Sequence, residues 1–277
     1  MLQTNVGPLF NGKTSTYTSP SSREITIRET NGDDDEILSD ISTSMTGENI
    51  NNFLANIVMV DSSLGDRKPE VLDILKWPVN DKYYTLLKHR ILSFGDLLKF
   101  TKTCQNEKCP TYDVEQDLKE FDSDLSKNRK DTEDTSKGGE SKSIQSGRPI
   151  EDLFRIRPYK LGLNPFVEFI TSSGKTLRFK ILTGELERKQ LDMPGGKTNK
   201  NTKLIIRELE VQNKGNWELV THFNAFSSRE TSEIRSKVLE FDTTFDPQVL
   251  TTCPSCGQKY SDSLLSIPAF YFPEEGI

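Results

Sequence analysis

The four cysteines of this chain fall into two pairs, and these pairs constrain the fold more than any other feature. Cys253 and Cys256 belong to a Cys-Pro-Ser-Cys-Gly turn, whereas Cys104 and Cys109 lie far upstream with four residues between them. Two thiolates separated by two residues on a tight turn make half of a tetrahedral zinc site. A four-thiolate site needs both pairs, so we expect the fold to bring Cys104 and Cys109 next to Cys253 and Cys256 around a structural Zn²⁺ ion.

Two disulfides, or four unrelated thiols, are the alternatives to this zinc site. Residues 1–20 lack the apolar segment of a secretory signal peptide, so we expect a reducing compartment, which favours metal over disulfides. Cys-x-x-Cys is also a redox motif, but Pro254 and Gly257 indicate a knuckle followed by a strand rather than a helix start. His89 and His222 lie outside both pairs, which argues against an open catalytic zinc site with histidine ligands.

The composition excludes several other classes of protein. Net charge is −6, which disfavours binding to nucleic acid through phosphate contacts. No apolar run approaches the ~18 residues of a membrane span. Gly174-Lys175-Thr176 resembles the end of a phosphate-binding loop, but position 169, where that motif needs glycine, is Phe169. Nothing else in the sequence points to nucleotide binding or to a catalytic nucleophile, so we expect no enzyme.

Composition and periodicity divide the 277 residues into four segments. Residues 1–22 are expected to be a flexible N-terminal arm, and residues 23–112 an α+β part that holds the first cysteine pair. Residues 113–150 read as a polar, mostly disordered linker, and residues 151–277 as a β-rich part with a capped helix and the second pair. The predicted class is therefore α+β, with helices and short antiparallel β hairpins joined at a zinc-ribbon-like four-cysteine knuckle and a disordered insertion. Because the zinc site draws on both structured parts, they are expected to form one unit.

In the first structured part, residues 25–28 alternate as a strand does. The acidic run at 33–36 suits the positive end of a helix dipole and predicts a helix start, with a cation site as the alternative. Apolar spacing predicts further helical segments within 50–60, 71–75 and 82–92, the last of them capped by Asp81. Residues 97–103 are expected to lead into the first cysteine pair as a strand.

In the second structured part, alternation predicts several strands and one helix. Ser227 and Glu230 form a capping-box pattern, which predicts a helix start. The C-terminal aromatic segment at 267–273 suits either a docking segment or a lid on the core. Residues 25–32 also align with 177–184, which suggests a reused strand-turn-helix unit. The predicted strands lie at 154–157, 166–170, 176–181, 203–211, 217–220 and 249–250.

The order of these motifs resembles a known family. Leu86, Leu87 and Arg90 precede Ser93-Phe94-Gly95 and the first cysteine pair; Phe241-Asp242, Cys253-Pro254-Ser255-Cys256-Gly257 and Ala269-Phe270-Tyr271-Phe272-Pro273 follow. This order resembles the baseplate hub and hub-assembly proteins of T-even-like contractile-tailed bacteriophages over residues 24–110 and 166–273. The chain departs from a standard ribbon in the four residues between Cys104 and Cys109, and in its long polar insertion.

The resemblance implies a non-enzymatic protein of the virion tail baseplate, made in the host cytoplasm. It would bind other phage tail and baseplate hub proteins, as a hub subunit or as a hub-assembly factor, without nucleic acid or a small-molecule substrate. The alternative function is a zinc-ribbon protein that binds nucleic acid or regulates transcription. We rank it second because the net charge is negative and Lys259 is the one base close to Cys253 on its C-terminal side.

Overall fold

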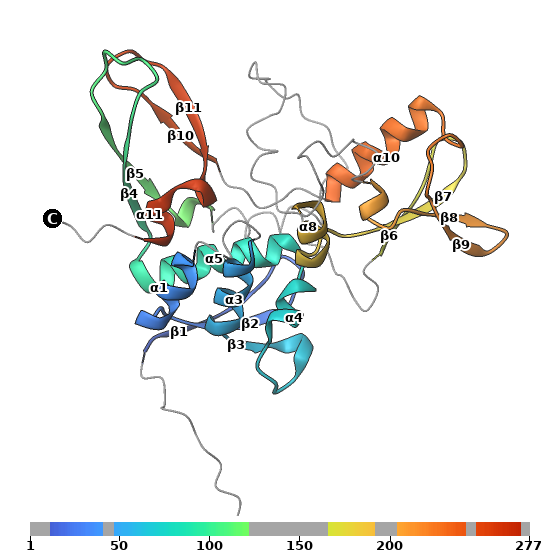
Figure 1. Cartoon of the computed structure of the whole chain (residues 1–277), viewed down its shortest axis with the longest axis horizontal. Helices are drawn as coiled ribbons and strands as arrows, with labels where there is room; N and C mark the ends of the chain where they lie inside the picture. Colours follow the sequence, from blue (N-terminus) through green and yellow to red (C-terminus); the bar gives the residue numbers. More distant parts are fainter. Residues whose placement is uncertain (1–11, 41–46, 122–165, 192–203, 242–247, 273–277) are drawn as a thin grey trace, which may run out of the picture.

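The computed structural model describes residues 12–40, 47–121, 166–191, 204–241 and 248–272, which form helices and four antiparallel sheets (Figure 1). This arrangement confirms the α+β class. The polar segment at 122–150 and the predicted strand at 154–157 lie outside the described residues.

A three-stranded sheet and the helices on it form the first core. The strand order is β1 (Thr14–Thr18), β2 (Glu24–Arg28) and β3 (Val58–Asp61), and each neighbouring pair is antiparallel. Ile25 and Ile27 of β2 are fully buried, because alternate side chains of a strand face the same side. The helices of this core are α1 (Gly32–Ser39), α3 (Glu48–Ile57), α4 (Val71–Leu75) and α5 (Val79–Phe94), and the short 3₁₀ turn η1 (Ser62–Leu64) follows β3.

The acidic run lies in the first turn of α1, as predicted, and Asn31 is the N-cap residue. Asn31 accepts hydrogen bonds from the backbone N–H groups of Asp33 and Asp34, and the Asp34 carboxylate accepts one from Asn31 N at 2.7 Å. Arg28 also donates to both Asp34 oxygens, at 2.7 and 2.8 Å. The buried carboxylate of Asp34 is therefore used in helix capping and in a bidentate ion pair, which supports the helix start over a cation site.

Two hairpins rise from this first core. One joins β4 (Leu97–Lys102) to β5 (Tyr112–Asp117), and the other joins β10 (Gln248–Thr252) to β11 (Lys259–Ser263). Figure 1 shows them side by side, in green and in red, although they are far apart in the sequence. Leu98 of β4 and Val249 of β10 are both fully buried in the first core, so each hairpin is anchored there at its base.

The C-terminal segment closes the first core as a lid. It consists of the 3₁₀ turn η2 (Leu264–Ser266) and the short helix α11 (Pro268–Tyr271), which contacts β4. Phe270 is 2% exposed, while Phe272 is 43% exposed. Of the two interpretations of this segment, the buried ring of Phe270 supports the lid.

A four-stranded sheet forms the second core, with the order β6 (Phe166–Ile170), β7 (Thr176–Lys180), β8 (Glu210–Asn213) and β9 (Asn216–Leu219). Helix α10 (Ser228–Phe241) covers one face of this sheet. Its Ile234 and Val238 are buried in one apolar cluster with Leu177, Phe179 and Leu209. The predicted capping box is confirmed. Ser227 N donates to Glu230 Oε2 at 2.7 Å, and Glu230 N donates to Ser227 Oγ at 3.1 Å.

Helix α8 (Gly184–Leu191) connects this second part to α5. Val79 N donates to Leu182 O at 2.9 Å, and Gly184 N donates to Trp77 O at 3.1 Å. The strand-turn-helix pattern seen at β2–α1 also occurs at β7–α8, in agreement with the sequence alignment of the two segments.

Several boundaries differ from the sequence prediction. Residues 14–18, expected in the flexible arm, form β1 on the edge of the first sheet. Residues 113–117, expected in the linker, form β5 together with Tyr112, because Tyr112, Val114 and Gln116 alternate with acids that face solvent. Residues 204–206 are helical rather than extended, and the strand begins at Glu210.

The start of α5 also differs from the prediction. Pro78, not Asp81, occupies the N-cap position. Asp81 is fully buried inside the first turn, where it accepts hydrogen bonds from the backbone and hydroxyl of Ser21. The sequence did not reveal this partner because Ser21 lies in the turn between β1 and β2, far from α5 along the chain.

Candidate metal centre

The two hairpins bring the four cysteines together at their turns. Cys104 and Cys109 lie between β4 and β5, and Cys253 and Cys256 lie between β10 and β11. The four Sγ atoms all lie within 4.8 Å of one another. All four cysteines are free thiols, and the Sγ atoms of Cys104 and Cys256 are 3.6 Å apart, much farther than the ~2.05 Å of a disulfide. The predicted convergence of the two pairs is confirmed.

Backbone hydrogen bonds shape the turn that holds Cys253 and Cys256. Gly257 N donates to Cys253 O at 2.9 Å, and Cys253 N donates to Gln258 O at 2.8 Å. Gly257 has φ +73°, a left-handed conformation that glycine adopts without a Cβ clash. The glycine directly after the second cysteine therefore lets the chain reverse and enter β11 with both thiols on the same side.

The longer turn with Cys104 and Cys109 is closed in a similar way. Cys109 N donates to Asn106 O at 2.9 Å, and Asn106 N points at Cys104 Sγ, 3.4 Å away. Four intervening residues therefore do not prevent this pair from converging, because the extra residues are taken up in a hydrogen-bonded loop.

The geometry of the four sulfurs fits a tetrahedral ion. Zn–S bonds of about 2.3 Å place the sulfurs of a tetrahedral site about 3.8 Å apart. The 3.6 Å separation of Cys104 and Cys256 is close to that value, and the whole cluster lies within 4.8 Å. Four cysteine ligands would fill all four positions of such an ion and leave none for water or substrate.

Tyr260 of β11 reaches across to the other hairpin and contacts the cysteine cluster. Its hydroxyl accepts a hydrogen bond from Gln105 N at 2.9 Å and lies 3.0 Å from Cys104 Sγ. Since the backbone N–H already donates to this oxygen, the hydroxyl proton is available to donate to the sulfur. The Lys102 ammonium lies 4.9 Å from the centre of the Tyr260 ring and pairs with Asp262, which holds the ring in place.

Tyr260 is not among the site residues that the sequence predicts. Its signal is the alternation within β11, which places Tyr260 on the side of the strand opposite to the exposed residues Lys259 and Ser261. That signal identifies an inward-facing tyrosine but not the thiol that it meets.

The surroundings of the thiols shift the pKa values of Cys104 and Cys109 in opposite directions. Donation by Tyr260, and then by Asn106 N, lowers the pKa of Cys104 to about 7, so its thiolate is well populated at neutral pH. Desolvation, together with hydrogen bonds to its neighbouring thiols, raises the pKa of Cys109 to about 12. One thiolate forms readily here, whereas further deprotonation calls for a cation to balance the charge, as a bound metal ion does.

The two histidines lie away from the four thiols. His89 is buried in α5, where its Nε2 is 3.0 Å from Thr30 Oγ1 and 3.1 Å from Ser93 Oγ. His222 is exposed in the segment between β9 and α10.

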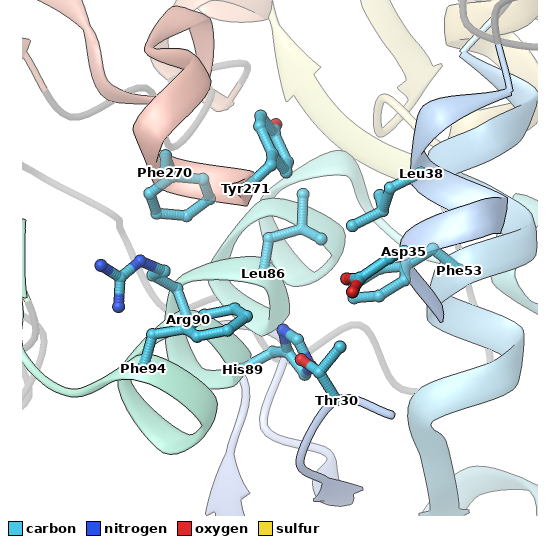
Figure 2. A pocket seen from close by; sticks show the side chains of 10 residues that line it. All are labelled: Thr30, Asp35, Leu38, Phe53, Leu86, His89, Arg90, Phe94, Phe270 and Tyr271. Carbon is cyan, nitrogen blue, oxygen red and sulfur yellow. The ribbon is translucent and has the colours of Figure 1, made fainter. Parts of the chain in front are cut away.

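A separate small pocket lies between α1, α3, α5 and α11 (Figure 2). Its walls are largely aromatic and aliphatic, and include Phe53, Leu86 and Phe270. Burial lowers the pKa of His89 at its floor to about 4, so the imidazole is neutral at physiological pH. The buried Arg90 guanidinium, labelled in Figure 2, donates to Gly95 O at 3.0 Å and stacks on Phe94. These polar groups are engaged in fixing the end of α5.

Comparison with known proteins gives no relative: no family model, no curated protein and no solved structure matches this chain. Among the described helices, none is long and apolar enough to cross a membrane.

Proposed function

We propose that Cys104, Cys109, Cys253 and Cys256 bind one structural Zn²⁺ ion in a zinc-ribbon-like site. The proposal is supported by the convergence of four sulfurs from two hairpins that are remote in the sequence. When bound, the ion supplies the bonds and the positive charge that hold the two turns together. Metal binding of this kind is coupled to folding, because the unfolded chain has no preformed site.

We further propose that the chain is a baseplate hub subunit or hub-assembly factor of a contractile-tailed bacteriophage, and that it acts by binding proteins. The order of motifs over residues 24–110 and 166–273 supports this assignment. An all-sulfur metal site supports a binding role over metal catalysis, because catalytic zinc keeps a position for water or substrate.

The alternative, a zinc-ribbon protein that binds nucleic acid, fits the charges of the hairpins less well. Lys102 is paired with Asp262, and Lys99 is paired with Glu115 at 2.6 Å. Strand β5 also exposes Asp113, Glu115 and Asp117 along one face. Acids beside the metal site repel phosphates, so a basic surface for nucleic acid is not formed by this pair of hairpins.

Quantitative mass spectrometry of purified phage particles and of tail-assembly intermediates tests the proposed function. A few copies per mature particle would identify a permanent hub subunit, whereas presence in intermediates alone would identify an assembly factor. Absence from both would overturn the phage assignment. Tight DNA binding at ~0.2 M salt would then favour the nucleic-acid alternative, because binding through phosphates alone is weak at that ionic strength.

A further inference from the structure

Strand β6 forms one edge of the four-stranded sheet (Figure 1). It pairs with β7 in continuous antiparallel register, from Phe166 opposite Lys180 to Ile170 opposite Thr176. In the part of the chain that the structure describes, no strand pairs with the opposite side of β6. Thr171 N donates to Lys175 O, toward the β7 side. In an antiparallel ladder, residues that bond to the neighbouring strand alternate with residues whose backbone groups point away from it. The backbone N–H and C=O groups of Glu168 and Ile170 therefore point away from β7.

This edge has few of the features that usually protect a sheet from adding another strand, and Glu168 is its one charged residue. Proteins blunt their edges with charges, bulges or very short strands. Strand β3 has an irregular register opposite Thr26 and Ile27, and β9 has four residues, of which one is Glu218. Strand β6 has five residues in regular register, and four of them are apolar. Ile170 is 68% exposed, more than the other large apolar residues of this sheet.

The two faces of β6 differ in what they would offer an added strand. Val167 and Phe169 pack against the second core, so the inner face extends an apolar surface. The outer face carries Phe166, Glu168 and Ile170, and Glu168 is exposed with no ion-pair partner among the described residues.

The basic residue opposite Glu168 already forms an ion pair with another residue. Arg178 lies opposite Glu168 in the register, but it pairs with Glu210, and its guanidinium lies between the rings of Phe166 and Trp217, 4.3 and 4.2 Å from their centres. The Glu168 carboxylate is therefore the unmatched charge on an otherwise apolar strand.

We propose that the edge of β6 binds an extended segment of a partner protein, which adds a fifth strand to this sheet. The segment carries Lys or Arg opposite Glu168, and apolar residues two positions away on either side, against Phe166 and Ile170. Main-chain hydrogen bonds supply affinity in such strand addition, and the alternate side chains supply specificity. This inference rests on the proposed protein-binding function and names the surface that would carry it.

A second copy of this chain fits the edge less well than a partner of this chemistry. In the centred antiparallel register, Glu168 would face Glu168 of the other copy. Like charges directly opposite one another destabilise a strand pair.

The test uses the full-length, zinc-loaded chain and the acetylated, amidated peptide Ser-Ile-Val-Lys-Val-Val-Ser. Residue-resolved amide exchange by NMR should find the amides of Glu168 and Ile170 exchanging faster than those of Val167 and Phe169 in the free chain. The peptide should slow them. A matched peptide with Glu in place of Lys should bind roughly fivefold to tenfold more weakly, as expected for a repulsive in place of an attractive cross-strand pair.

Two variants complete the test. Glu168→Lys should reverse the preference between the two peptides, and Ile170→Pro should abolish binding by removing an outward N–H that the sheet itself does not use. Slow exchange of Glu168 and Ile170 in the free chain would overturn the proposal, because the edge would already be occupied. Equal binding of both peptides by Glu168→Lys, or a dimer that this variant disrupts, would also overturn it.

The two proposals can fail separately. Loss of the chain from phage particles and intermediates, with the peptide preference intact, would refute the phage function and leave the edge site standing. Presence in particles with no reversal by Glu168→Lys would refute the edge site alone.

Discussion

The Lys82 ammonium of α5 lies 3.0 Å from Glu187 Oε2 of α8, and this ion pair joins the two cores of the molecule. The Lys82 side chain is 3% exposed and that of Glu187 is 24% exposed. Tyr83 also donates a hydrogen bond to Glu187, at 2.5 Å. The glutamate therefore balances a buried charge at the place where the second part of the chain meets the first.

Replacing Glu187 with Gln should destabilise the protein strongly. The substitution leaves Lys82 buried without a counter-charge, and breaking a buried pair in this way costs about 3 kcal/mol in the free energy of unfolding. Urea denaturation measures the loss. The matched control is Glu115→Gln, because the Lys99–Glu115 pair is 65% and 59% exposed and should contribute less than about 1 kcal/mol. Equal effects of the two substitutions would contradict the assigned role of Glu187.

Cys253→Ser should abolish metal binding and lower solubility together. The hydroxyl of serine is a far poorer zinc ligand than a thiolate, and the hairpin turns lose the bond between them. Elemental analysis of the purified protein gives the zinc content, and the control is Ser255→Ala, an exposed position in the same turn. One full equivalent of zinc in Cys253→Ser would refute the four-thiolate site. Cobalt in place of zinc should give the spectrum of a tetrahedral four-sulfur site.

Tyr260→Phe should raise the pKa of Cys104 from about 7 toward the ordinary range of a cysteine thiol. The hydroxyl of Tyr260 stabilises the thiolate by donating to it, so its removal favours the protonated form. Zinc affinity should fall about tenfold, since hydrogen bonds to metal ligands tune binding by such factors. Thiolate absorbance of the metal-free protein against pH reports the shift.

Tyr112→Phe is the control for this measurement. Tyr112 also bridges the two hairpins, through a 3.4 Å contact with Thr251, but it does not contact a thiol in the described structure. An unchanged titration in Tyr260→Phe would show that another group sets the pKa of Cys104.

His89 should make stability depend on pH below neutrality. Burial lowers its pKa to about 4, whereas an unfolded chain has a histidine pKa near 6.5, so the unfolded state binds the extra proton between these values. The contribution of His89 is complete above about pH 6.5 and is lost as pH falls toward 4. We expect a loss of about 2 kcal/mol between pH 7 and pH 5 from this group.

His89→Gln should remove this part of the pH dependence, although it lowers stability at pH 7 through lost packing. The exposed His222 provides the control variant His222→Gln, which should leave the dependence unchanged. The comparison uses urea denaturation of all three proteins at both pH values. A His89→Gln protein with the same pH dependence as the natural chain would contradict the assignment.

Elements with local causes could be predicted from the sequence. The acids after Asn31 predict the start of α1 because capping and the helix dipole act within one turn, and Ser227 with Glu230 predicts α10 for the same reason. Cys253-Pro254-Ser255-Cys256-Gly257 predicts its own turn, because the positive φ at Gly257 and the spacing of the thiols are local properties. The need for four ligands predicted that the two cysteine pairs would meet.

Other contacts between distant groups could not be predicted and are known from the packing of the folded chain. Tyr260 donates to Cys104 because two hairpins pack side by side, and Glu187 neutralises Lys82 because α8 docks on α5. The sequence predicts β1 as part of the flexible arm and residues 113–117 of β5 as part of the linker, because these stretches are polar. They form strands because their backbone groups hydrogen-bond to those of β2 and β4. Such contacts depend on the packing of whole elements, which no short stretch of sequence encodes.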